Sequence, residues 1–157
     1  MYIFEPEVSV LQIVISAGDS VDSNFWWKEL LLFFAHPGEY FEIHCWKNGI
    51  GEIETAKQFG EIACFQLPNF IIINGIINEK IIHFFKNVDK PEKYSGYNKM
   101  VPFYTLHIGG FFFSEDYGTR MILKPESSKD KIEIQKILKK YNVSSRNINN
   151  QNIWRVL

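Results

Sequence analysis

The segment "GEIETAK" (51–57) carries the pair of side chains best suited to proton transfer, Glu52 and Glu54. If this segment is extended, the two carboxylates share one face, because alternate residues of a strand point to the same side. Two neighbouring carboxyl groups can serve as general acid and general base, as they do in glycosidases. A solvated acidic strand face is the commoner outcome of such a pattern, and we favour it over a catalytic pair.

The histidine and cysteine residues give weaker evidence for a catalytic or metal site than the two glutamates do. His44 and Cys45 are adjacent in "EYFEIHCWK" (39–47), so in a strand they face opposite sides and cannot bind one metal ion together. Cys64 lies in the apolar run "EIACFQ", which predicts a buried, unreactive thiol. The sequence contains no phosphate-binding loop, dinucleotide-binding fingerprint, zinc-protease motif or hydrolase nucleophile elbow. We therefore predict no catalytic residue, no metal and no cofactor.

Composition and charge narrow the class of protein. A chain of 157 residues predicts a single globular domain, 1–157, that is long enough to bury a core. A net charge of -1 argues against a dedicated nucleic-acid-binding protein, which is normally basic. The apolar runs are much shorter than the roughly 18 residues of a membrane span, and the N-terminal segment lacks the basic start of a signal peptide. We expect a cytoplasmic protein that binds neither nucleic acid nor membrane.

The elements that must position these residues alternate between helical and extended patterns. The apolar segment "FWWKELLLFFAH" (25–36) predicts a helix packed on more than one side. Residues 39–47 alternate as a strand does, and Asn48-Gly49 predicts a hairpin that returns through 51–67 as one or two short strands.

The second half of the chain continues the pattern. The run "FIIIN" (70–74) predicts a strand buried on both faces, and Asn78 can cap a short helix after it. A polar loop (89–100) leads to a hairpin closed by Gly109-Gly110, whose second strand carries three consecutive phenylalanines. A third strand and a final helix that begins with a capping box at Ser127 follow. The fold class is α+β, a mostly antiparallel β-sheet with about three helices packed on it, and 147–152 is a loose segment before the C-terminal end.

The hairpin and the final helix, "YTLHIGGFFFSEDYGTRMIL" through "KIEIQKILKKY", resemble the C-terminal part of small bacterial immunity proteins. Such proteins accompany the toxin domains of contact-dependent growth-inhibition and related polymorphic toxin systems. The resemblance covers about a third of the chain and lies in the pattern F-x-x-x-(E/D)-D-Y-G-T. It implies a single-domain antitoxin that binds one toxin domain and blocks its active site or substrate groove.

Many such toxins are nucleases with basic substrate surfaces, so an acidic patch on the antitoxin would accelerate encounter. The resemblance transfers no contact residue position by position, and we choose the candidates by chemical type. Tyrosine and tryptophan provide large contact area at little entropic cost, and acidic side chains complement a basic partner. The candidate partner-binding residues are Glu52, Glu54, Glu115, Asp116, Tyr117, Trp46, Tyr94 and Tyr97.

Two other functions fit the same sequence. The chain could be a small α+β enzyme or ligand-binding domain that uses Glu52 and Glu54, or His44, in a sheet-lined pocket. It could also be a homodimer that buries the apolar faces of its strands against a second copy.

Overall fold

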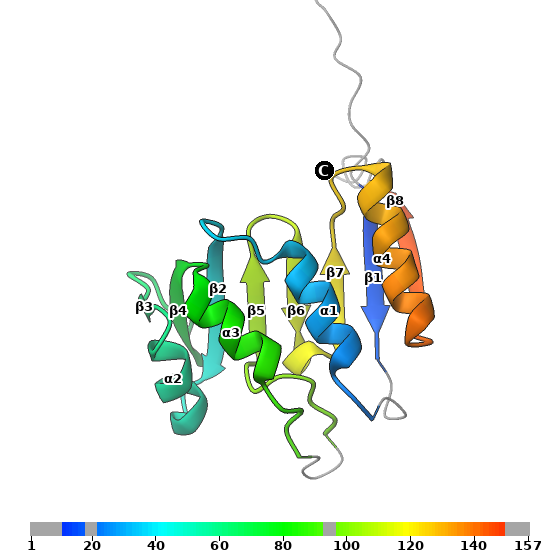
Figure 1. Cartoon of the computed structure of the whole chain (residues 1–157). Helices are drawn as coiled ribbons and strands as arrows, with labels where there is room; N and C mark the ends of the chain where they lie inside the picture. Colours follow the sequence, from blue (N-terminus) through cyan, green and yellow to red (C-terminus); the bar gives the residue numbers. More distant parts are fainter. Residues whose placement is uncertain (1–10, 18–21, 93–96, 150–157) are drawn as a thin grey trace, which may run out of the picture.

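The protein is built on one antiparallel sheet, seen in a computed structural model that describes residues 11–17, 22–92 and 97–149 (Figure 1). The eight strands follow the order β3-β4-β2-β5-β6-β7-β1-β8, and every neighbouring pair is antiparallel. The strands are β1 (Leu11–Ser16), β2 (Tyr40–Trp46), β3 (Glu61–Ile62), β4 (Phe70–Ile76), β5 (Thr105–Ile108), β6 (Phe112–Glu115), β7 (Arg120–Leu123) and β8 (Ser145–Asn149).

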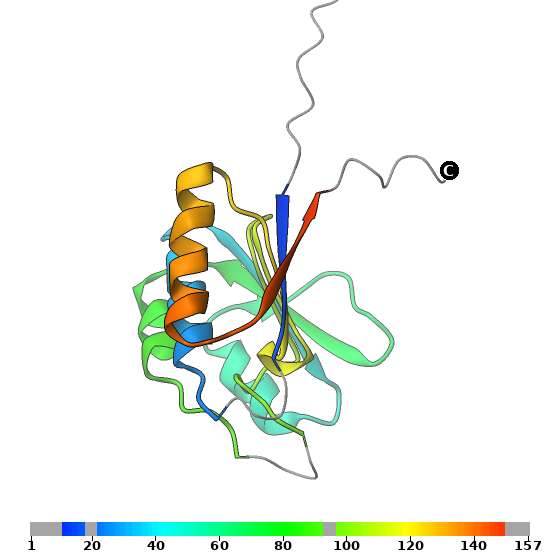
Figure 2. The same ribbon diagram turned by 90° about the vertical axis from the view of Figure 1, so that its right-hand side faces the viewer.

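Three helices cover one face of this sheet. They are α1 (Phe25–Phe34), α3 (Glu79–Asn87) and α4 (Ser128–Lys140), and Figures 1 and 2 show all of them on the same side. A fourth helix, α2 (Ile50–Lys57), lies near the end of β2 where that strand leaves the sheet (Figure 1). The predicted α+β class, with a mostly antiparallel sheet and helices packed on it, is confirmed.

Helix α1 is the centre of the core. It contacts α3 and α4, and its Trp27 and Phe34 rings pack on Phe112 of the sheet, which confirms the predicted packing on more than one side. The Trp27 side chain is fully buried, and its ring lies 5.8 Å from that of Phe85 and 6.2 Å from that of Phe112. Its indole Nε1 donates a hydrogen bond to the Ser114 hydroxyl at 3.0 Å. A bulky aromatic side chain can thus be buried without leaving its N–H unpaired.

The prediction that all three consecutive phenylalanines belong to one strand is wrong for Phe111, which lies in the turn before β6. Phe112 faces the helices and is fully buried, whereas Phe113 lies on the opposite face, 4.8 Å from the His107 ring. On that opposite face, called the open face below, the described residues place no helix (Figure 2).

The predicted hairpin at Asn48-Gly49 is wrong. The chain turns there into helix α2 rather than into a second strand. Ala56 of α2 is fully buried and Ile53 packs against the core, so tertiary burial decides the helical state of a segment with little periodicity of its own.

The caps of two other helices are confirmed. The Asn78 side chain accepts a hydrogen bond from the Ile81 backbone N–H at 3.1 Å, and the Ser127 hydroxyl accepts one from Asp130 N–H at 3.1 Å. The predicted loose segment 147–152 is wrong for 147–149, which belong to β8 and pair with β1. Residues 150–152 lie outside the described residues. Polar side chains suit β8 because it is an edge strand.

Candidate functional site

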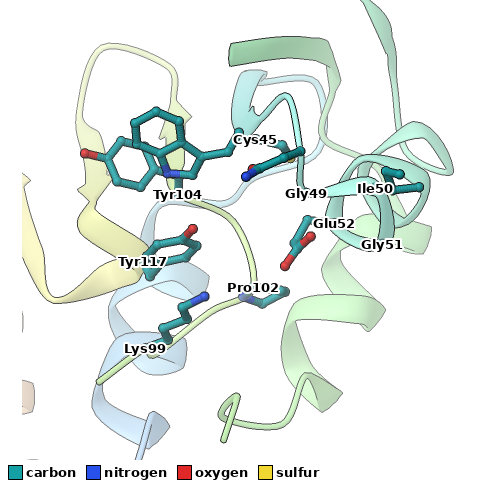
Figure 3. Close-up of a pocket in the computed structure, with 11 residues that line it drawn as sticks. Cys45, Gly49, Ile50, Gly51, Glu52, Lys99, Pro102, Tyr104 and Tyr117 are labelled. Atoms are coloured by element: carbon teal, nitrogen blue, oxygen red, sulfur yellow. The ribbon is translucent and has the colours of Figure 1, made fainter. Parts of the chain in front are cut away.

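A pocket of about 490 Å³ opens at the end of the sheet where β2 finishes and β5 begins (Figure 3). We call it the end pocket. Its walls come from β2, the first turn of α2, the segment before β5 and the turn after β6, and its lining residues are Cys45, Trp46, Asn48, Gly49, Ile50, Gly51, Glu52, Lys99, Pro102, Tyr104 and Tyr117. Segments far apart in the sequence thus converge on one cavity.

Four aromatic rings form one wall and extend it toward β4. We call Trp46, Phe70, Tyr104 and Tyr117 the aromatic cluster. The Tyr104 ring stacks on Phe70 with centroids 5.2 Å apart, contacts Trp46 at 5.1 Å and meets Tyr117 edge-on at 5.3 Å. Trp46 and Phe70 lie 4.3 Å apart. Rings locked against one another lose little entropy on binding, which makes the cluster a suitable recognition surface.

The turn that carries Asp116 and Tyr117 has an unusual backbone. Asp116 (φ 49°) and Tyr117 (φ 58°) are both left-handed, and Gly118 (φ 82°) follows them. Tyr117 N–H donates to the Tyr104 carbonyl at 3.0 Å, and the Tyr117 carbonyl accepts from Met100 N–H at 2.8 Å. Non-glycine residues in this region cost roughly 1–2 kcal/mol each, so the surrounding hydrogen bonds must hold the turn in place.

Gly118 ties this turn to the core. A Cβ atom at this position would lie 2.8 Å from Trp27 Nε1 and 2.9 Å from Met100 Cβ. Only glycine combines the positive φ with this close approach. The orientation of the Tyr117 ring therefore depends on the packing of helix α1.

Carboxylates set the charge of the end pocket. Burial first, and then the negative charge of Glu52, raises the pKa of the Tyr117 hydroxyl. Burial likewise raises the pKa of Tyr104, with further contributions from the hydrogen bond and charge of Asp116 and the charge of Glu115. Both phenols therefore stay protonated at neutral pH.

One cation completes the wall. Lys99 Nζ lies 4.0 Å from the centroid of the Tyr117 ring, within the range of a cation–π contact. In Figure 3 the Glu52 carboxylate and the Lys99 ammonium face the same space from different sides.

The structure gathers several of the predicted partner-binding residues. Trp46, Glu52 and Tyr117 line the end pocket. Asp116 and Glu115 adjoin it through Tyr104. Tyr97 is 68% exposed and close enough to Tyr117 to influence its pKa. Tyr94 lies outside the described residues.

Glu54 is separate from this group. Because 50–57 is a helix rather than a strand, Glu52 and Glu54 do not share a face, and the predicted carboxylate pair is wrong in its geometry. Glu54 is exposed and pairs with Lys57 at 3.5 Å. Glu52 alone reaches the pocket.

His44 lies outside the end pocket, on the open face of the sheet. Its Nε2 is 2.6 Å from a carboxylate oxygen of Glu42, and its ring is 5.6 Å from that of His107. Burial, followed by the charge of His44, lowers the pKa of His107. The alternative in which His44 acts in a sheet-lined pocket therefore does not apply to the end pocket.

The two cysteines have opposite environments. Burial, with a smaller contribution from Glu52, raises the pKa of the Cys45 thiol to about 12, so this thiol stays protonated. Cys64 is exposed, and the prediction that it is buried is wrong. The part of the chain that the structure describes holds no group of three or more His, Cys, Asp or Glu side chains that could bind a metal ion.

Sequence reasoning missed Lys99 and Tyr104. Tyr104 is two residues before Leu106, so regular alternation would place it in the core. The chain is bent over 100–104, before β5 begins, and this bend turns Tyr104 toward Trp46 instead. Lys99 lies in a polar loop, where no periodicity distinguishes it from its neighbours. No signal in the sequence separates these two residues from ordinary loop and strand positions.

In comparisons with protein-family models, curated proteins and solved structures, no match to this chain was found. Among the described residues, no helix is both long enough and apolar enough to cross a membrane. The fold and the end pocket describe an α+β protein with helices on one face of its sheet and an aromatic and acidic pocket at one end.

Proposed function

We propose that this chain is a cytoplasmic immunity protein that binds a toxin domain, a nuclease, and blocks its active site or substrate groove. The observation that carries the proposal is the convergence of the aromatic cluster with Glu52, Glu115 and Asp116 at one end of the sheet. Partly exposed aromatic rings ringed by charge are the usual composition of a protein-binding hot spot.

Rigidity supports binding through this surface. Trp46 belongs to β2, Tyr104 directly precedes β5, and the backbone of Tyr117 is held by hydrogen bonds on both sides. Side chains on a rigid frame lose little freedom when a partner binds, so more of the contact energy contributes to affinity.

Charge supports a basic partner. Glu52, Glu115 and Asp116 lie within or beside the end pocket, and the cations Lys99 and Arg120 lie near them. The pair between Arg120 and Glu115 is long, 3.9 Å, and both side chains are exposed, so it neutralises that carboxylate only weakly. A basic nucleic-acid-binding groove would be attracted to this surface.

The test uses co-expression with the polypeptide encoded immediately upstream of the gene for this chain. If that polypeptide ends in a toxin domain, this chain should restore growth and co-purify with it. The variant Trp46→Ala should weaken both effects, whereas Tyr40→Ala should not. Tyr40 is the matched control because it lies on the same face of β2 with similar exposure, 44% against 37% for Trp46, at the other end of the strand. Growth that stays inhibited with the wild-type chain present contradicts the proposal.

The size of the end pocket favours one other function. About 490 Å³ falls within the range of small-molecule sites. As a ligand-binding domain or enzyme, the chain would depend on Glu52 as the carboxylate that faces the cavity. A Glu52→Gln variant that retains a detected activity would remove this second candidate.

A further inference from the structure

The ring of Tyr117 already holds a positive charge from its own chain. Lys99 Nζ approaches its centroid to 4.0 Å. The negative face of an aromatic ring attracts a cation in this way, and tyrosine is among the rings that do so effectively. The end pocket thus shows a built-in preference for positive charge on at least one of its walls.

Carboxylate charges act on the hydroxyls of both pocket tyrosines. Apart from burial, the charges that act on Tyr117 and Tyr104 all raise their pKa values, and the carboxylates among them are Glu52, Asp116 and Glu115. A potential that opposes ionisation of a phenol favours a cation placed at the same point. The pocket is therefore better suited to a positive ligand than to a negative one.

We propose that the end pocket receives an arginine side chain of the bound partner, with Glu52 as counter-ion of the guanidinium and Tyr104 and Tyr117 as the aromatic wall beside it. This inference rests on the proposed function, because it names the group that the partner inserts. Guanidinium suits the site better than ammonium, since it is planar, stacks on aromatic rings and offers a carboxylate two parallel hydrogen bonds.

Glu52 is placed to act as that counter-ion. It lies in the first turn of α2, and its Oε2 rests 2.8 Å from the position that a Cβ on Gly49 would take. Within the described residues Glu52 forms no ion pair, whereas Glu54 on the same helix is paired with Lys57. The Glu52 charge is therefore available to a ligand.

Lys99 gives the proposal a distinctive consequence. Its ammonium repels an entering guanidinium, so removing the charge of Lys99 should strengthen binding of a cation. An anionic ligand would respond in the opposite direction, and a zwitterion would lose affinity when either Lys99 or Glu52 is neutralised. The sign of the Lys99 effect thus identifies the charge of the ligand.

The experiment titrates the isotopically labelled full chain with N-acetyl-arginine amide and follows the NMR signals of residues lining the pocket. We expect saturable shifts, and none with the neutral isostere N-acetyl-citrulline amide. Glu52→Gln should weaken binding about tenfold, the scale of a charged hydrogen bond. Lys99→Met should strengthen it about threefold, the scale of a screened like-charge repulsion. Glu54→Gln, with the same charge change on the exposed side of α2, should leave binding unchanged.

Any of three results overturns the proposal: no saturable shift with the arginine probe, equal binding of the citrulline probe, or weaker arginine binding by the Lys99→Met variant. Circular dichroism of each variant shows that the fold is retained. The probe reports on the pocket alone, whereas the growth assay reports on the toxin. If the wild-type chain binds the arginine probe but does not restore growth, the toxin assignment is rejected and the arginine site is retained. If it restores growth but does not bind the probe, the arginine assignment is rejected and the toxin assignment is retained.

Discussion

Replacing Gly118 by alanine tests the link between the core and the recognition surface. The added Cβ would lie 2.8 Å from Trp27 Nε1 and 2.9 Å from Met100 Cβ, in a backbone with φ of 82°. The left-handed conformation costs roughly 1–2 kcal/mol for alanine, and the steric overlap costs roughly 1–3 kcal/mol more. We expect the free energy of unfolding to fall by about 2–5 kcal/mol, which is the sum of these two terms.

Urea denaturation followed by tryptophan fluorescence measures this loss directly. Gly110→Ala is the matched control, because Gly110 lies in the other turn of β6, its φ is not positive, and a Cβ there meets nothing within 4 Å. It should change stability by less than about 1 kcal/mol. A Gly118→Ala variant as stable as the Gly110→Ala variant would refute the argument from close packing. Because the turn holds Tyr117, the same substitution should also weaken partner binding.

Other outcomes follow from the described contacts. Ser114→Ala leaves the buried indole of Trp27 without its acceptor and should cost about 1–3 kcal/mol in urea denaturation; a neutral result would show that another acceptor replaces it. The exposed Cys64 thiol should react with Ellman's reagent at pH 8 in the native protein. The Cys45 thiol should not react, because Cys45 is buried and has a pKa of about 12. Two fast-reacting thiols would contradict this prediction. The lowered pKa of His107 means that the unfolded chain binds the proton more readily, so stability should fall as pH drops below about 6.5. His107→Gln should flatten that part of the pH profile, and an unchanged slope would assign it to other groups.

The possible homodimer stays a prediction. Sedimentation at micromolar concentration measures it, and a monomer would count against burial of the open face by a second copy.

Much of the fold was accessible from the sequence because local signals agreed with tertiary packing. The alternation of 40–46, the Gly109-Gly110 turn and the caps at Asn78 and Ser127 each reflect a local rule that the fold obeys. The failures have a common cause. Helix α2 and strand β8 have weak patterns of their own, and their states depend on neighbours that only the folded chain supplies.

The site was predictable only in its residue types. Choosing exposed aromatic and acidic side chains found Trp46, Glu52 and Tyr117, because those types suit recognition wherever they lie. Their convergence depends on the helical state of 50–57 and on the left-handed turn at 116–118. Neither feature has a dependable local signal, and Glu54 was included because 50–57 was expected to be extended. Lys99 was missed because it lies in a polar loop without periodicity.

Hydrogen–deuterium exchange on the complex with the upstream-encoded toxin domain tests the central claim most directly. Binding through the end pocket predicts slower exchange in 45–52, 99–104 and 116–118, with the β7, β1 and β8 side of the open face unchanged. Protection confined to β7, β1 and β8, with these three segments exchanging as in the free chain, would contradict the account.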